Sequence, residues 1–239
     1  MAATVPGTCM AFISKHSEAK IIRIQLRQNL VLRHLDDEQW TELEPLLEIE
    51  DYAKSEALEL QGGLAMEQYF IIEGILKRVV SNSQGKEMIL RFAAESDIDT
   101  SYAAWRLGTP IPYSIRTVTK ARTVKLAMPQ WGHFLEHHPK IKQEFEFEVM
   151  RLMADVMAHT ITLHLLDAPG RVRRFMRKHP ELVDRLPKKE LASYLNLSPE
   201  TLSRLKRRGK VQFGSSLPTR TARNPGASGT AAEIVGEHR

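Results

Sequence analysis

A short helix predicted near residue 200 carries the side chains whose chemistry is easiest to interpret. Glu200, Ser203 and Arg204 stand at i, i+3 and i+4, so they would share one face of a helix. Arginine offers a fork of donors that matches guanine O6 and N7, glutamate accepts from the cytosine amino group, and serine can donate or accept. This combination predicts direct contact with the edges of base pairs.

Other side chains around the same helix are suited to phosphate groups. Basic and hydroxyl side chains can position a protein on a phosphate backbone without reading the sequence of bases. The predicted phosphate contacts are Lys188, Lys189, Ser198, Thr201, Lys206, Arg207, Arg208 and Lys210. The alternative interpretation is an ordinary pair of helices with a charged, solvated surface.

Two helices joined by a tight turn are predicted to hold these side chains. Pro187 suits the start of the first helix, and Ser198 followed by Pro199 suits the N-cap and first position of the second. The apolar side chains that would pack the two helices together are Leu191, Ala192, Leu195, Leu202 and Leu205. This is the layout of a helix-turn-helix, whose second helix enters the major groove of DNA.

The charge of the chain is concentrated in the same segment. The 239 residues have a formal net charge of +5, yet residues 1–167 hold 18 Lys and Arg against 23 Asp and Glu, a net of −5. Residues 168–210 hold 13 against 4, a net of +9, and residues 211–239 add only +1. An acidic body with one strongly basic segment indicates an anionic partner for that segment, with nucleic acid as the leading candidate, and the alternative is a solvated basic face. Together with the helix-turn-helix, this charge distribution predicts double-stranded DNA as the partner.

Composition and motif content narrow the classes of protein to which the chain could belong. A chain with 42% hydrophobic and 26% charged residues can bury a core. No apolar run is long enough to span a membrane, and the first residues do not resemble a secretory signal, so a cytoplasmic protein is expected. The one cysteine, Cys9, cannot supply the ligands of an iron–sulfur cluster. Motifs of common hydrolases, phosphate-binding loops and zinc proteases are absent, so no enzyme is expected.

Upstream of residue 130, short runs of β-branched and aromatic residues predict an antiparallel barrel or sandwich. Turn signals separate the runs, among them a hairpin tip over residues 81–86. A helix over residues 29–47, with Asp36 as an N-cap, precedes the strands, and a short helix over Trp131–Leu135 follows them. The predicted strands are Ala57–Leu60, Tyr69–Glu73, Ile75–Val80, Glu87–Phe92, Tyr113–Thr119 and Arg122–Ala127.

Residues 139–166 contain no glycine and no proline after the first position, which predicts one long helix. The length favours pairing with a second copy of the chain, and the alternative is a helix that packs on its own barrel. The predicted dimer contacts are Phe145, Val149, Leu152, Val156 and Leu163. The helix would end at Asp167, which marks a domain boundary.

Over roughly residues 29–210 the chain resembles the Crp/Fnr superfamily of bacterial transcription regulators. The resemblance rests on Tyr69–Gly74, Gly85–Leu90, Leu165–Val172 and Glu200–Arg204, the last being similar to the Glu-x-x-Ser-Arg pattern of the Fnr branch. It implies an α+β fold with a jelly-roll barrel like that of cyclic-nucleotide-binding domains, a dimer on the long helix and a winged helix-turn-helix. It also implies TTGAT-like half-sites in an inverted repeat, with RNA polymerase as a further partner.

The stretch that matches the cyclic-nucleotide pocket departs from the family. Members that bind cyclic nucleotides carry a Gly-Glu pair and, further on, an Arg-Ser pair, whereas this chain has Thr100-Ser101 and Ile111-Pro112. Cyclic AMP is therefore not expected, because a buried phosphate would lack its arginine; Arg116 is the one candidate substitute. An altered pocket for an unidentified small molecule is expected around Thr100, Ser101, Tyr102, Trp105, Tyr113 and Arg116. The alternative is that the aromatic side chains belong to the core.

Haem is the remaining candidate cofactor, because it needs only an axial ligand. No histidine lies between Leu35 and Gly132, which leaves His159 and His164 on the long helix.

The expected domains are an N-terminal extension over 1–28, a sensor barrel over 29–138, a dimerisation helix over 139–167, a DNA-binding domain over 168–214 with a shortened wing, and a disordered tail over 215–239. The rival function is a ligand-binding regulatory module that acts through protein partners rather than DNA.

Overall fold

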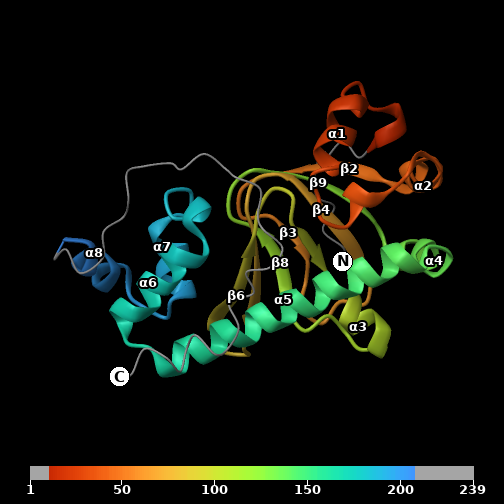
Figure 1. Ribbon diagram of the computed structural model, residues 1–239. Helices are drawn as coiled ribbons and strands as arrows, with labels where there is room; N and C mark the ends of the chain where they lie inside the picture. The colour runs from red at the N-terminus through yellow and green to blue at the C-terminus, as the bar shows by residue number, and fades with distance from the viewer. Residues whose placement is uncertain (1–10, 208–239) are drawn as a thin grey trace, which may run out of the picture. The chain divides into compact units, whose positions relative to one another are not determined.

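The structure is a computed structural model that describes residues 11–207 (Figure 1). These residues form two compact units, which divide between Asp155 and Val156. The sequence placed the boundary later, at residues 167–168. The division falls inside the long helix because the last part of this helix packs with the helices that follow it. There the His159 ring stacks on Tyr194, with ring centroids 3.7 Å apart.

The strands of the first unit pair in two antiparallel sheets. One sheet has the order β1-β2-β9-β4-β7 and the other β3-β8-β5-β6. The strands are β1 Ala11–Phe12, β2 Glu48–Tyr52, β3 Ala57–Glu59, β4 Glu67–Glu73, β5 Leu76–Ser81, β6 Glu87–Ala93, β7 Ile98–Thr100, β8 Ser114–Thr117 and β9 Ala121–Ala127. Within residues 11–207 no ladder joins one sheet to the other, so the strands form two antiparallel sheets, as in the sandwich alternative of the prediction, and not a closed barrel.

The six predicted strands are present as β3, β4, β5, β6, β8 and β9, with ends that differ by at most two residues. Sequence analysis missed the other three strands. β2 reads Glu-Ile-Glu-Asp-Tyr and β7 reads Ile-Asp-Thr, so acidic residues weaken the strand signal. β1 has only two residues, which is too short for a recognisable alternation.

Eight α-helices are described, and the longest, α5, contributes residues to both units. They are α1 Ala19–Leu26, α2 Asp37–Leu43, α3 Tyr102–Leu107, α4 Met128–His137, α5 Pro139–Leu165, α6 Ala168–Lys178, α7 Lys188–Tyr194 and α8 Pro199–Arg207. Short 3-10 turns lie at Ile13–Lys15, Leu32–His34, Glu44–Leu46 and Pro180–Leu182. Within residues 11–207 no helix has the combination of length and apolar character that crossing a bilayer requires.

Residues 29–47, predicted as one helix, are divided into three shorter pieces. Asp36 starts α2 as predicted, and its side chain accepts a hydrogen bond from the Gln39 N–H at 2.9 Å. The Gln39 side chain accepts in return from the Asp36 N–H at 3.0 Å, which completes a capping box. Because the Asp36 backbone is extended, the helix cannot continue from the preceding turn into α2.

Residues 11–28, which the sequence analysis assigned to an N-terminal extension, belong to the first unit. β1 pairs with β2, where Ala11 faces Ile49. Ile13, Ile22 and Leu26 are each 1% exposed. These side chains add apolar area to the main core, which explains why the segment folds against the sheets.

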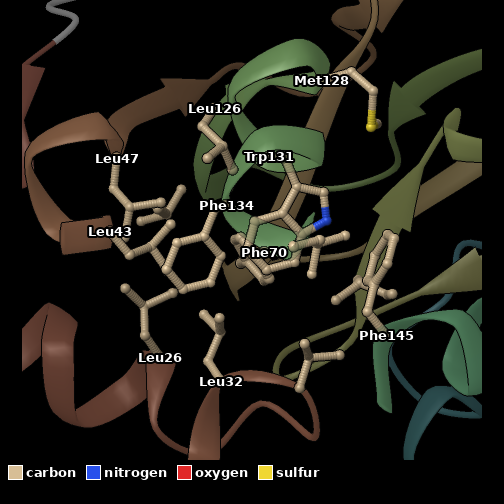
Figure 2. Close-up of a cluster of buried hydrophobic side chains, with 14 of the residues drawn as sticks. Leu26, Leu32, Leu43, Leu47, Phe70, Leu126, Met128, Trp131, Phe134 and Phe145 are labelled. Atoms are coloured by element: carbon tan, nitrogen blue, oxygen red, sulfur yellow. The ribbon is translucent and has the colours of Figure 1, made fainter. Parts of the chain in front are cut away.

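Trp131 lies at the centre of the main core (Figure 2). Its ring meets Phe70 at 5.6 Å and Phe145 at 5.3 Å, both edge to face, and stacks on Phe134 at 5.5 Å. Such aromatic pairs each contribute about 0.5–1.5 kcal/mol beyond the area they bury. Since Phe70 is in β4 and Phe145 in α5, the cluster fastens the first part of α5 to the sheets.

Candidate functional site

The two helices predicted near the end of the described chain are present as α7 and α8. Leu191, Ala192 and Leu202 are at most 4% exposed, as expected for the faces that pack together. Asn196 has a left-handed φ of 52°, a conformation that asparagine tolerates better than most residues. The Leu197 N–H donates to the Ala192 carbonyl at 2.9 Å, which closes the turn and sets the direction of α8.

Ser198 caps α8, as predicted. Its hydroxyl oxygen accepts a hydrogen bond from the Thr201 N–H at 3.1 Å, and Pro199 is the first residue of the helix. A serine cap of this kind typically contributes about 1 kcal/mol. The same hydroxyl lies 3.1 Å from Thr201 Oγ1, so both predicted phosphate contacts already have a partner at the cap.

The predicted base-contacting side chains lie on the outward side of α8. Glu200 and Arg204 are exposed and Ser203 is half-buried, while the leucines of the opposite face are buried. The backbone N–H of Glu200 and the Ser198 hydroxyl hold the pKa of the Glu200 carboxyl below its ordinary value. Glu200 therefore remains an ionised hydrogen-bond acceptor at neutral pH.

The remaining predicted phosphate contacts are described in part. Lys188 and Lys189, at the start of α7, are exposed, and so is Arg207 at the end of α8. The Lys206 side chain, Arg208, Lys210, the predicted wing, the predicted tail and Cys9 lie outside the described part of the chain.

Arg171 of α6 connects three backbone segments of the second unit. Its Nη1 donates to the carbonyls of Leu195 at 2.8 Å and Asn196 at 3.3 Å. Its Nε donates to the Leu166 carbonyl at 3.1 Å. Arg171 therefore links the turn between α7 and α8 to Leu166, the residue that follows α5. Sequence analysis missed this role because main-chain acceptors leave no residue-type signal.

His159, a candidate haem ligand, has a packing role in the second unit. Its ring lies parallel to Tyr194 with an interplanar angle of 2°. Burial is the main cause that lowers the pKa of His159 to about 4, so the ring is neutral at pH 7. Haem ligation would require the ring to leave this stack. Within residues 11–207 no group of three or more His, Cys, Asp or Glu side chains is placed to hold a metal ion.

α5 has two apolar faces. The residues predicted as dimer contacts lie mainly on the face that is buried within the first unit. Phe145, Val149 and Leu152 are 0%, 8% and 5% exposed and belong to the core of the first unit. They cannot serve as the predicted dimer contacts, and for these three residues the alternative of a helix packed on its own sheets is correct. Val156 and Leu163 are half-buried.

The other apolar face of α5 is open to water. Its large exposed side chains are Phe147 at 58%, Met150 at 60%, Met153 at 57% and Met157 at 66%. We call these four residues the α5 stripe. Together with Ala154, the positions 147, 150, 154 and 157 follow the alternating three- and four-residue spacing of a coiled-coil seam.

The interior of the first unit contains a buried charge pair that bridges the sheets. Arg78 of β5 and Asp99 of β7 are 7% and 0% exposed, and Arg78 Nε donates to Asp99 Oδ1 at 2.5 Å. Arg78 Nη2 also donates to the Thr100 carbonyl at 2.8 Å. The Tyr113 ring covers the guanidinium, with its centroid 4.5 Å from Cζ. Burial opposes the charge of Arg78, but Asp99 raises its pKa above the ordinary value.

Glu59 lies beside this pair and completes what we call the polar cluster, namely Glu59, Arg78, Asp99, Thr100, Ser101 and Tyr113. Ser101 Oγ donates to Glu59 Oε2 at 2.5 Å, and the Glu67 N–H donates to Oε1 at 2.8 Å. Burial, which outweighs both hydrogen bonds, raises the pKa of the Glu59 carboxyl to about 7. The polar cluster therefore contains a carboxyl group that titrates near neutral pH.

The structure brings together only part of the predicted effector pocket. Thr100, Ser101 and Tyr113 belong to the polar cluster, where the Tyr113 hydroxyl donates to the Thr100 carbonyl at 2.7 Å. Tyr102 and Trp105 lie on α3, with ring centroids 5.8 Å apart. Trp105 packs over Gly132 of α4 so closely that a Cβ there would lie 2.4 Å from the indole, and it is a partly buried side chain packed against the main core.

Arg116, the candidate substitute for the missing phosphate arginine, does not reach the polar cluster. In the ladder of β5 and β8, Arg78 pairs with Ile115, whereas Arg116 pairs with Lys77. Paired residues point to the same face and neighbours along a strand to opposite faces, so Arg116 points away from the interior. It lies 3.6 Å from Glu87 of β6 instead.

Glu59, Arg78 and Asp99 were missed as site residues. Arg78 lies two residues after the buried Leu76 in β5 and so points to the same, inward face. This position in the strand was the one available signal. The pairing with Asp99 could not be read from the sequence, because the two residues come from different sheets.

Comparison with known proteins shows the fold. No protein-family profile matches the chain. The cAMP-activated global transcriptional regulator CRP of Salmonella typhimurium is 20% identical over 167 residues, which cover 66% of this chain and 80% of CRP. The c-di-GMP responsive global regulator CLP of Xanthomonas campestris has a TM-score of 0.61 at 14% identity, covering 73% of this chain and 92% of that chain.

A second solved structure agrees. FixK2 of Bradyrhizobium japonicum has a TM-score of 0.58 at 17% identity, covering 70% of this chain and 88% of that chain. The chain therefore has the cyclic-nucleotide-binding-like fold of Crp-type proteins, with antiparallel sheets and helices.

Proposed function

We propose that this protein is a sequence-specific DNA-binding transcription regulator of the Crp/Fnr type. The observation that carries the proposal is the outward face of α8, where Glu200, Ser203 and Arg204 stand on a helix that is capped and buried on its other side. In this role Arg204 reads a guanine, and Glu200 accepts from a cytosine amino group. The similar proteins CRP and CLP are described as global regulators, which supports the class.

The active form in this proposal is a homodimer that pairs along the α5 stripe. A row of large apolar side chains in water is typical of an interaction surface, and its spacing suits a second, identical helix. Two copies of α8 would then read TTGAT-like half-sites in an inverted repeat. Their separation would be about one helical turn of DNA, roughly 34–36 Å.

The first unit would receive the controlling signal in this proposal. Arg78 is paired with Asp99. Arg91, the other buried arginine near Asp99, lies 3.9 Å from its Oδ2 and donates to the Ile98 carbonyl at 3.2 Å. Arg116 points away from the interior, so each arginine near the polar cluster either has a partner there or faces outward. Cyclic AMP is therefore not the expected effector, and the effector of the polar cluster is unassigned. RNA polymerase is proposed as the further partner of the DNA-bound dimer, in the cytoplasm.

Fluorescence anisotropy with two labelled duplexes tests the proposal against a module that acts through protein partners. One duplex contains two TTGAT-like half-sites in inverted repeat, and the control has the same composition in scrambled order. The proposal predicts tighter binding to the repeat, on the order of a thousandfold. No binding to either duplex at low salt would favour the protein-partner alternative.

A further inference from the structure

A groove of about 320 Å³ lies between α3 and α5 of the first unit. Figure 1 shows α3 beside α5, and the edge-to-face contact of Tyr102 with Phe145, with centroids 5.0 Å apart, holds the two helices together. The volume is at the lower end of the range that holds small organic ligands. The lining residues are Tyr102, Ala103, Arg106, Leu107, Glu146, Val149 and Met150.

The walls of the groove are apolar on both sides. Leu107 of α3 is 75% exposed, and Met150 of α5 is 60% exposed. Large apolar side chains that stay in water on both sides of a groove favour an apolar occupant, because the occupant removes their surface from water. The body of a suitable ligand is therefore a short hydrocarbon.

The polar side chains of the groove differ in how they are engaged. The Tyr102 hydroxyl donates to Glu146 Oε1 at 2.8 Å, so Glu146 has a neutral hydrogen-bond partner. Arg106 is exposed, and its guanidinium lies 5.9 Å from the centroid of the Tyr102 ring. Among the residues from 11 to 207, no carboxylate pairs with it. Of the two charged side chains of the groove, Arg106 is thus the one without a hydrogen-bond partner among the described residues. A guanidinium binds a carboxylate through two parallel hydrogen bonds.

We propose that this groove binds a small apolar carboxylate, of the class of medium-chain fatty acids. The carboxylate pairs with Arg106, and the hydrocarbon lies between Leu107 and Met150. The binding site itself does not depend on the proposed DNA binding. Met150 also belongs to the α5 stripe, so a link between the ligand and the paired helices does rest on the proposed function.

Calorimetric titration of the full chain with decanoate, decanol and decylammonium tests the site. The three probes share their hydrocarbon and differ in charge. We expect decanoate to bind most tightly, and Arg106→Gln to reduce its advantage over decanol about tenfold or more. Ala103→Trp fills the groove and should abolish binding of all three probes, and Leu107→Gln, at a position that is 75% exposed, should weaken all three alike. Arg33→Gln, at an exposed position outside the groove, is the matched control and should change nothing.

The same experiment distinguishes an apolar carboxylate from a cationic ligand, from a ligand bound elsewhere and from a second copy of the chain. Tighter binding of decylammonium would mean that Glu146 dominates, and decanoate binding that ignores Arg106→Gln and Ala103→Trp would place the ligand elsewhere. Either result overturns the proposal. Binding that occurs only in a variant made monomeric by Met157→Glu would show that a second copy of the chain fills the groove, which also overturns it. Direct binding is measured without DNA, so failure here leaves the proposed function intact.

Discussion

Arg204 is the single side chain on which base recognition depends most in this account. It is exposed, and α8 is fixed behind it by a serine cap and a buried leucine face. Arg204→Ala should weaken binding to the preferred duplex by about 1–3 kcal/mol and relax the preference at one base pair. Arg33→Ala, an exposed arginine of the first unit, is the control in the same anisotropy assay. Equal weakening on every duplex would instead assign Arg204 to the phosphate backbone.

Glu59 makes the stability of the first unit depend on pH. Its pKa is raised from 4.5 to about 7, mainly by burial, so the folded state holds a proton that the unfolded state has released. The stabilisation is complete below pH 4.5 and is lost as the pH rises through 7. The urea concentration at the unfolding midpoint of the wild type should therefore decrease as the pH is raised from 5 to 8.

Glu59→Gln should remove this part of the pH dependence, because the amide keeps an acceptor for the Glu67 N–H without a charge. Glu73→Gln, at an exposed position of β4, is the control and should retain the wild-type fall. If Glu59→Gln retains that fall as well, the titrating group lies elsewhere in the unit.

Residues of the candidate site could be predicted where the signal is local. The cap at Ser198 and the spacing of Glu200, Ser203 and Arg204 lie within a few residues of one another, and the structure places them as expected. The pair of Arg78 and Asp99 depends on two sheets meeting. Such long-range contacts leave no pattern in a single sequence.

At the scale of elements, the cap of α8 is a direct test of how this helix is held. Ser198→Ala leaves the Thr201 N–H without its partner at 3.1 Å. The expected loss of stability of the second unit is about 0.5–2 kcal/mol, measured by urea unfolding monitored by circular dichroism. Ser193→Ala, exposed on α7, is the control. An unchanged midpoint in Ser198→Ala would show that the turn alone sets the start of α8.

The α5 stripe should determine the oligomeric state. Met157→Glu places a charge in a row of apolar side chains, and two copies would have to bury both charges. Sedimentation velocity should show a monomer for this variant and a dimer for the wild type. Met88→Glu is the control, because Met88 lies on β6, is 45% exposed and is outside the α5 stripe. This variant should stay dimeric. A dimer of Met157→Glu would remove the stripe from the interface.

The error about α5 has a clear physical origin. Its apolar residues fall on two faces, one around Phe145 and Leu152 and the other around Phe147 and Met157. Both faces satisfy helical spacing, and only the packed structure shows that the first faces its own sheets. The helix itself was predictable because its length and lack of interruptions are properties of the local sequence.

At the scale of the whole molecule, charge is divided between an acidic body and a basic segment. Residues 168–210 carry a net +9 against −5 for residues 1–167. Long-range attraction to a polyanion therefore falls on the segment that contains α6, α7 and α8. Repulsion by the acidic body disfavours contact of DNA with the first unit.

The most direct test of DNA binding is the salt dependence of the dissociation constant for the inverted-repeat duplex. Each phosphate that a basic side chain neutralises releases counterions, and six or more such contacts weaken binding on the order of a thousandfold between 50 and 200 mM salt. The account predicts this steep loss, together with a preference for the repeat over the scrambled duplex at every salt concentration. An affinity that is flat across this range, or the absence of binding at 50 mM, would contradict it.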